Sequence, residues 1–185
     1  MRTLALLLTA LAAGCMSRPD GPTAHIAGDV LLTLPTPPGY PETRTIVQTG
    51  RARYGERQAA FEAVLSLAPD RTEIVVTMLA GPRLATIVWD EAGVHEDRAL
   101  IAPPGLPVEN ILADLFVAVW PAEAVAASLP EGVTLVVDEH GGRTIQRDGQ
   151  VILVVTRDEA DPARTVVRND AFGYEVAIVS QSLEP

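Results

Sequence analysis

Side chains that could serve as catalytic groups or metal ligands are spread through the sequence without the spacing that such chemistry requires. His25, His95 and His140 lie in three separate regions, and no HExxH pattern places two histidines on one helical face. The acidic clusters beside them, His95-Glu96-Asp97 and Asp138-Glu139-His140, lie near predicted turns, where solvated charge accounts for them. A serine nucleophile elbow, a dinucleotide-binding loop and a P-loop are also absent from the sequence. We therefore predict a protein that is not an enzyme and has no catalytic residue, metal site or cofactor.

Asp114 and Arg143 are the charged residues for which the sequence predicts a structural role. Asp114 lies among apolar residues in a predicted helix, and burial of a lone carboxylate costs several kcal/mol. The carboxylate therefore needs solvent or a partner, and we predict Arg143 as that partner. The pair would form a latch that holds the helix across the mouth of a cavity. An ordinary structural ion pair is the alternative interpretation.

The single cysteine, Cys15, follows an apolar N-terminal segment. The stretch from Leu4 to Leu11 is apolar except for Thr9, which is typical of a secretory signal, and it is shorter than the roughly 20 residues that span a bilayer. A lone cysteine cannot form an intramolecular disulfide. Leu11-Ala12-Ala13-Gly14-Cys15 resembles the bacterial lipobox. This resemblance implies that residues 1–14 are removed as a signal peptide and that Cys15 is lipidated.

The residue after Cys15 bears on the membrane to which a lipidated chain is sorted. Met16 stands where an aspartate favours inner-membrane retention in enterobacterial lipoproteins. The resemblance to these lipoproteins therefore implies attachment to the outer membrane, on its periplasmic face, with inner-membrane retention as the alternative. Several acyl chains on one residue would make this attachment stable.

Length and charge narrow the class of protein further. A chain of 185 residues fits one ordinary domain. Its 24 acidic residues against 14 basic ones give a formal net charge of −10, which is the wrong sign for binding a phosphate backbone. We therefore exclude nucleic acid as a partner.

The mature chain divides into a predicted tether and a predicted domain. Residues 15–41 contain the lipidated cysteine and two proline-rich stretches, which favour an irregular tether. Residues 42–185 form a single β-rich domain, in which short apolar segments alternate with turn signals. The predicted strands are 43–48, 60–67, 72–79, 84–89, 94–100, 133–138, 143–146, 150–156, 165–168 and 174–180, and the predicted helices are 107–120 and 121–129.

Strands, then helices, then strands again indicate an α+β protein with an antiparallel sheet. Segments 74–76, 135–137 and 151–155 are apolar on both faces, so we expect both faces of the sheet to be covered there. The second half of the first helix is apolar all round, which predicts its burial. We therefore predict a strongly curved antiparallel sheet, a half-open β-barrel, with one or two helices packed in or over its concave face.

Such a concave face is either packed solid or partly open as a cavity for a hydrophobic ligand. The sequence does not distinguish the two, because both have the same hydrophobic pattern. The candidate cavity residues are apolar and lie on the predicted strands and helix. They are Leu65, Ile74, Val76, Met78, Ile87, Trp89, Ile111, Leu115 and Trp120.

Four segments carry a resemblance to a known family, over roughly residues 41–180. They are residues 111–121 (ILADLFVAVWP), Gly81-Pro82-Arg83-Leu84 with Trp89-Asp90, Arg143-Thr144-Ile145, and residues 173–178 (GYEVAI). Together they resemble an uncharacterised proteobacterial lipoprotein family that is encoded among genes for aryl polyene synthesis. Phe116 departs from the family, whose members commonly have glutamine there.

This resemblance implies an architecture distantly similar to LolA and LolB, which are half-open antiparallel barrels closed by helices around a hydrophobic cavity. It implies binding and handover of an acyl chain or an aryl polyene lipid. The implied partners are this lipid or another hydrophobic ligand, the membrane through the acyl anchor, and a periplasmic carrier protein. The alternative is a non-catalytic envelope scaffold with a filled core that acts through a protein partner.

Overall fold

The computed structural model describes residues 21–102 and 107–183. Within these residues the chain forms twelve strands and two helices. The strands are β1 (Thr23–Ala27), β2 (Val30–Thr33), β3 (Arg44–Tyr54), β4 (Arg57–Leu67), β5 (Arg71–Met78), β6 (Arg83–Asp90), β7 (Gly93–Arg98), β8 (Val133–Val137), β9 (Arg143–Arg147), β10 (Gln150–Arg157), β11 (Arg164–Asn169) and β12 (Tyr174–Leu183), and the helices are α1 (Val108–Val119) and α2 (Ala122–Ser128).

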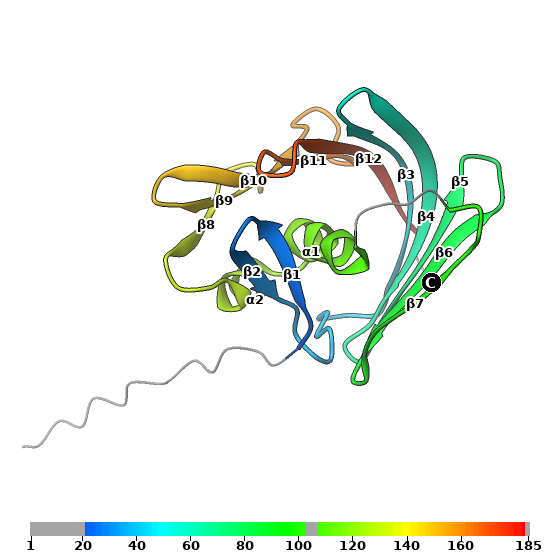
Figure 1. Ribbon diagram of the computed structural model, residues 1–185, viewed down its shortest axis with the longest axis horizontal. Helices are drawn as coiled ribbons and strands as arrows, with labels where there is room; N and C mark the ends of the chain where they lie inside the picture. Colours follow the sequence, from blue (N-terminus) through cyan, green and yellow to red (C-terminus); the bar gives the residue numbers. More distant parts are fainter. Residues whose placement is uncertain (1–20, 103–106, 184–185) are drawn as a thin grey trace, which may run out of the picture.

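Ten strands form one antiparallel sheet in the order β7-β6-β5-β4-β3-β12-β11-β10-β9-β8. Most neighbours are joined by short turns, and the long pairing of β12 with β3 unites the two halves of the chain. The sheet curves around α1 and stays open, because its end strands β7 and β8 are not paired with each other (Figure 1). The predicted α+β architecture, a strongly curved antiparallel sheet with helices at its concave face, is confirmed.

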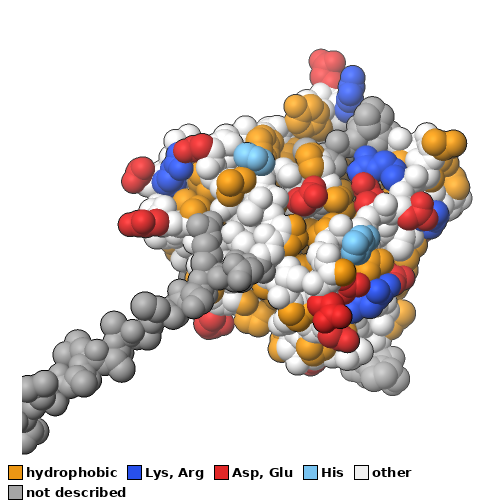
Figure 2. Space-filling model, turned by 60° about the horizontal axis from the view of Figure 1, so that its bottom comes forward, with side chains coloured by type: hydrophobic (Ala, Val, Ile, Leu, Met, Phe, Trp, Pro, Cys, Tyr) orange, Lys and Arg blue, Asp and Glu red, His pale blue; other side chains and the backbone are white. Residues whose placement is uncertain are grey.

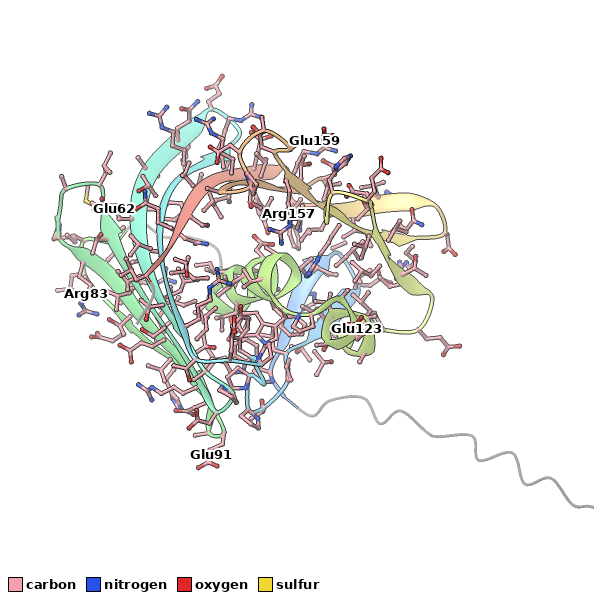
Figure 3. All side chains as sticks on the ribbon, turned by 180° about the vertical axis from the view of Figure 1, so that it is seen from behind. Glu62, Arg83, Glu91, Glu123, Arg157 and Glu159 are labelled. Carbon is pink, nitrogen blue, oxygen red and sulfur yellow. The ribbon has the colours of Figure 1, made fainter. Side chains whose placement is uncertain are left out.

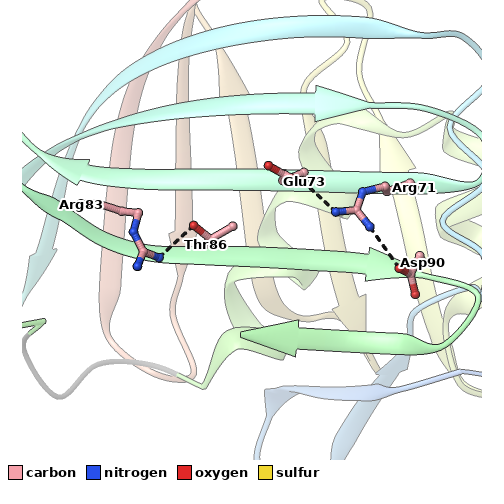
Figure 4. Close-up of polar contacts among 5 residues, drawn as sticks. All are labelled: Arg71, Glu73, Arg83, Thr86 and Asp90. Carbon is pink, nitrogen blue, oxygen red and sulfur yellow. Dashed lines mark hydrogen bonds and ion pairs between the residues drawn. The ribbon is translucent and has the colours of Figure 1, made fainter. Parts of the chain in front are cut away.

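The two faces of the sheet differ in polarity, as alternation along the strands requires. On β6, Ala85, Ile87 and Trp89 point to the inner, concave side and are at most 9% exposed. The outer side of β5 and β6 carries hydrogen-bonded charges: Arg71 contacts Glu73 at 2.8 Å and Asp90 at 3.4 Å, and Arg83 contacts Thr86 at 2.9 Å (Figure 4). Such exposed pairs contribute little stability, so their main effect is to keep this face in water.

The expectation that both faces of the sheet are covered is wrong for part of the second half. Val136 is 48% exposed and Val151 is 37% exposed, although both lie in strongly apolar strands. A few exposed valines are tolerated because β-branched residues favour extended backbone. The face of the molecule that Figure 2 shows also mixes apolar side chains with charged ones of both signs.

A proline precedes each of the two helices. Pro107 stands at the N-cap of α1, and its carbonyl oxygen accepts a hydrogen bond from the amide of Asn110 at 3.0 Å. The helix ends at Trp120, whose extended backbone is what a residue before proline prefers. Pro121 then starts α2. Within the described residues, no helix is long and apolar enough to cross a membrane.

The predicted tether over residues 15–41 is wrong for the part that the structure describes. Residues 21–41 contain the β1–β2 hairpin, which packs on α1, and its core residues are at most 2% exposed. These are Ala24, Ile26, Val30 and Leu32. The domain therefore begins before residue 42. Cys15 and the predicted signal peptide, residues 1–14, lie outside the described residues.

Side-chain donors explain how the proline-rich segment after β2 can be buried. The indole Nε1 of Trp89 donates to the carbonyl of Pro35 at 2.8 Å, and Nε1 of Trp120 donates to that of Pro38 at 2.7 Å. A segment without regular structure normally stays at the surface, because its backbone polar groups would otherwise be unpaired. Here the two tryptophans supply the partners, so the segment packs against the core.

Candidate functional site

Five of the nine candidate cavity residues lie in a closed core. Their exposed fractions are 3% or less, so they offer a ligand no free surface in this conformation. They are Leu65, Ile74, Ile87, Trp89 and Trp120. Their role as ligand-binding residues remains a prediction that needs the core to open.

An aromatic cluster fills this part of the concave space. The rings of Trp89 and Trp120 stack with their centroids 5.4 Å apart. Tyr40 and Phe116 pack edge-on or tilted against Trp120, at 5.1 and 5.5 Å. Phe116 is thus a core residue, fully buried in the position where relatives were expected to carry a polar glutamine. The cluster joins the proline-rich segment, β6 and α1 into one core.

The other four candidates keep apolar surface that is not buried. Val76 and Leu115 are partly buried, Ile111 is 36% exposed and Met78 is 46% exposed. Phe61 on β4 and Ile178 on β12 are also partly buried and share the inner side of the sheet with the core residues of their strands. We call this set the inner apolar surface: Phe61, Val76, Met78 and Ile178 from the sheet, with Ile111 and Leu115 from α1.

Phe61 owes its position to the residue opposite it. Gly50 on β3 pairs with Phe61, and a Cβ atom on Gly50 would collide with the ring. The far end of the phenyl ring therefore occupies the space that a side chain at residue 50 would fill. Neither residue is among the predicted site residues, although a glycine within a strand can mark the close approach of another side chain.

The predicted ion pair between Asp114 and Arg143 is wrong. Both carboxyl oxygens of Asp114 lie within hydrogen-bond distance of the Tyr174 hydroxyl, at 2.8 and 2.7 Å. Burial raises the pKa of Asp114 to about 7, although the bond to Tyr174 acts in the opposite direction. Burial and the neighbouring carboxylate also raise the pKa of Tyr174. Asp114 therefore ties α1 to the start of β12 rather than to β9.

Arg143 instead caps the C-terminal end of α1, together with Arg157. Arg143 Nη1 donates to the carbonyl of Val117 at 2.6 Å, and Arg157 Nη2 donates to that of Ala118 at 2.7 Å. The last carbonyls of a helix lack partners within it and carry partial negative charge, which explains why two cations gather there. Burial lowers the pKa of Arg143, and the charge of Arg157 lowers it further.

Arg157 was not among the predicted site residues, although the sequence contains a signal for it. It follows the inward-facing Val155 by two positions on β10, so strand alternation points it to the concave side. A charged residue at an inward position of an apolar strand needs a partner inside. Figure 3 shows Arg157 between the sheet and α1, with Glu123 on the neighbouring α2.

Two surface pockets lie away from the inner apolar surface. One has a volume of about 370 Å³ beside the β1–β2 turn, where Arg147 contacts Asp29 at 2.9 Å. The other has a volume of about 210 Å³ and lies near the β3–β4 turn and the start of β12. In the described part of the chain, no group of three or more histidine, cysteine, aspartate or glutamate side chains is placed to hold a metal ion.

Comparison with known proteins places the chain in a family. No curated protein matches the sequence. The structure is similar to that of a LolA superfamily protein from Nitrosomonas europaea, at 9% identity with a TM-score of 0.45, covering 77% of this chain and 86% of that one. It is also similar to a DUF1329 family protein from Desulfovibrio piger, at 9% identity with a TM-score of 0.30, covering 76% and 84%. Residues 45–182 match the family described as "Protein of unknown function (DUF3261)", and the chain belongs to this family.

Proposed function

We propose that this protein binds the apolar part of a lipid-like molecule on its inner apolar surface. The observation that carries the proposal is that the strand residues of the inner apolar surface stay partly exposed on the side of the sheet that otherwise forms the core, and that Ile111 on α1 is 36% exposed. Exposed apolar surface on a concave face is typical of binding sites, because covering it is favourable. Each methylene group that a ligand transfers from water would contribute about 0.8 kcal/mol.

The cellular setting is part of the same proposal. A lipid-anchored Cys15 would hold the protein at the outer membrane, facing the periplasm, where an acyl chain or an aryl polyene lipid is handed over. A periplasmic carrier protein would deliver or receive this cargo. Support for this setting comes from the N-terminal residues and from the resemblance of the sequence to a lipoprotein family. In this proposal the protein acts as a carrier and not as an enzyme.

Ligand uptake by a substituted inner surface tests the proposal. We would use a chain that begins at residue 16 and titrate it with a fluorescent fatty acid. Met78→Trp places a large ring on the inner surface, and we expect uptake to fall while the melting temperature stays close to that of the wild type. Val64→Trp is the matched control, because Val64 is 41% exposed and lies on the outer side of the adjacent strand. Equal uptake by both variants and the wild type would refute the proposed site.

A second candidate is a scaffold protein that acts through a protein partner. The aromatic cluster favours it, because Trp89, Phe116 and Trp120 fill the other part of the concave space completely. Native mass spectrometry of the protein purified from its own periplasm separates the two. A retained hydrophobic mass that is released on denaturation supports the carrier, whereas a bare mass that persists after incubation with fatty acids supports the scaffold.

A further inference from the structure

Arg143 and Arg157 carry more positive charge than the helix end they contact can balance. The C-terminus of a helix is equivalent to roughly −0.5 of an elementary charge, and two guanidinium groups face it. Among the described residues, neither arginine has a carboxylate oxygen within 4.0 Å, although Glu123 acts on Arg143 from farther away. A surplus of positive charge therefore remains on the inner side of an acidic protein.

Hydrogen-bond donors are also left over at this place. A guanidinium group has five N–H donors. Arg143 uses one of them on Val117, and its Nε is buried without a partner. Arg157 uses its Nε on the carbonyl of Gly141, at 3.0 Å, and one Nη2 hydrogen on Ala118. A buried donor without a partner is costly, and a ligand that accepts hydrogen bonds would remove this cost.

The register of the sheet connects this site to the inner apolar surface. Arg157 pairs with Thr165 across the strands, Thr165 with Ile178, Ile178 with Gly50, Gly50 with Phe61, and Phe61 with Met78. All six lie on the inner side of the sheet, because each is an even number of positions away from a buried core residue of its own strand. Five strand spacings give this inner row a length of about 24 Å along the curve, comparable to a long acyl chain.

We propose that Arg143 and Arg157 bind the anionic headgroup of an amphiphile, a carboxylate or a phosphate, whose apolar chain lies along the inner row toward Met78. This inference rests on the proposed function, because it assumes that an apolar chain binds there. Paired guanidinium groups suit such oxyanions, which accept two parallel hydrogen bonds from a planar donor. The row is then polar at one end and apolar along the rest, as an amphiphile is.

Three probes with the same alkyl chain separate the headgroup from the chain. Calorimetric titration of the chain that begins at residue 16 would compare dodecanoic acid, dodecyl phosphate and dodecanol, the two anions below their micelle concentrations and the alcohol below its solubility limit. We expect both anions to bind about tenfold or more tightly than the alcohol. The stronger of the two anions identifies the headgroup as a carboxylate or a phosphate. If dodecanol binds and the two anions bind no more tightly, the headgroup site is overturned and the proposed function is not. If none of the three probes binds, the proposed function is overturned as well.

Substitutions assign the preference for anions to these arginines. Arg157→Gln should lose most of it and leave dodecanol binding unchanged, and Arg157→Lys, which keeps the charge, should retain part of it. Arg51→Gln is the matched control, because Arg51 is exposed on the outer side of β3. A parallel loss of affinity for all three probes would show that Arg157 acts only by holding α1, and that would overturn the assignment. If Arg157→Gln does not fold, the comparison of Arg157→Lys with the wild type decides the same question.

Discussion

The carboxyl group of Asp114 faces a single hydroxyl group with both of its oxygens. A phenol has one hydrogen to donate, so an ionised carboxylate at this position leaves one oxygen without that donor, whereas a protonated one can donate to the phenol oxygen in return. Burial favours the neutral acid and outweighs the hydrogen bond from Tyr174, which raises the pKa of Asp114 to about 7 on balance. Asp114 is thus a residue whose charge state in the folded protein changes near neutral pH.

Asp114→Asn should remove a pH dependence of stability. The pKa of Asp114 is raised above its unfolded value of about 3.9, so between pH 4 and 7 the folded state binds the proton and the unfolded state does not. The free energy of unfolding therefore falls as the pH rises through this window. The size of the pKa shift corresponds to a fall on the order of a few kcal/mol. We expect the wild type to gain more stability than the variant between pH 8 and pH 5, in urea unfolding at each pH. Identical gains would show that Asp114 is ionised throughout.

At the scale of the elements, the β1–β2 hairpin is held to the rest of the protein by two buried amides. The hairpin is not part of the main sheet, so the outer carbonyls of β1 need other partners. Asn110 on α1 donates to the carbonyl of His25 at 2.7 Å, and Asn169 on β11 donates to that of Ile26 at 2.9 Å. Both asparagines are at most 7% exposed. Two elements that are far apart in the sequence thereby fix the position of the hairpin.

Asn169→Ala should therefore destabilise the protein. The substitution leaves the buried carbonyl of Ile26 without its donor and opens a small space, which we expect to lower the free energy of unfolding by about 1–3 kcal/mol. Gln58→Ala, an exposed amide on β4, is the control and should change it by less than about 0.5 kcal/mol. Denaturant unfolding of the three proteins measures both values. A loss at residue 169 no larger than that at residue 58 would mean that the amide does not hold the hairpin.

Gly50→Val tests the close contact between β3 and β4. The added side chain would collide with the Phe61 ring, and displacing the ring should cost about 1–3 kcal/mol. Phe61→Leu in the same chain should recover part of this loss, because a smaller side chain leaves room for the valine. A double-mutant cycle by urea unfolding gives the coupling between the two positions. Additive losses would indicate that the two side chains do not share the same space.

The elements that the sequence predicted are those with strong apolar alternation or proline boundaries. The two helices and the strands around residues 72–90 and 150–156 were predicted closely for this reason. Residues 49–54 of β3 and 57–59 of β4 were missed, because their inner positions include Gly50, Ala52 and Ala59, which give little apolar signal. The β1–β2 hairpin was missed because its carbonyls are paired by distant side chains. The partner of Asp114 depends on the same long-range geometry, which local spacing does not contain.

At the scale of the whole molecule, the concave side of the sheet has two parts with different packing. One part contains the stacked pair of Trp89 and Trp120 and is closed. The other contains the inner apolar surface and, at the β10 end of the inner row, Arg157 (Figure 3) with Arg143 beside it on β9. Helix α1 contributes the fully buried Phe116 to the closed part and the partly buried Leu115 to the inner apolar surface. The ligand that we propose for the inner apolar surface would therefore leave the aromatic core closed.

Ligand binding should raise the melting temperature while leaving the tryptophan signals unchanged. A ligand that binds only the folded state stabilises it by an amount that grows with the logarithm of the ratio of ligand concentration to dissociation constant. Trp89 and Trp120 are the two tryptophans of the chain, and their rings stack 5.4 Å apart, so near-ultraviolet circular dichroism reports their packing. Trp120→Phe, which breaks the pair, identifies this signal.

With dodecanoic acid we expect a higher melting temperature and the same near-ultraviolet spectrum. A higher melting temperature with a changed spectrum would place the ligand in the aromatic core, and the five buried candidates, not the inner apolar surface, would then line the site.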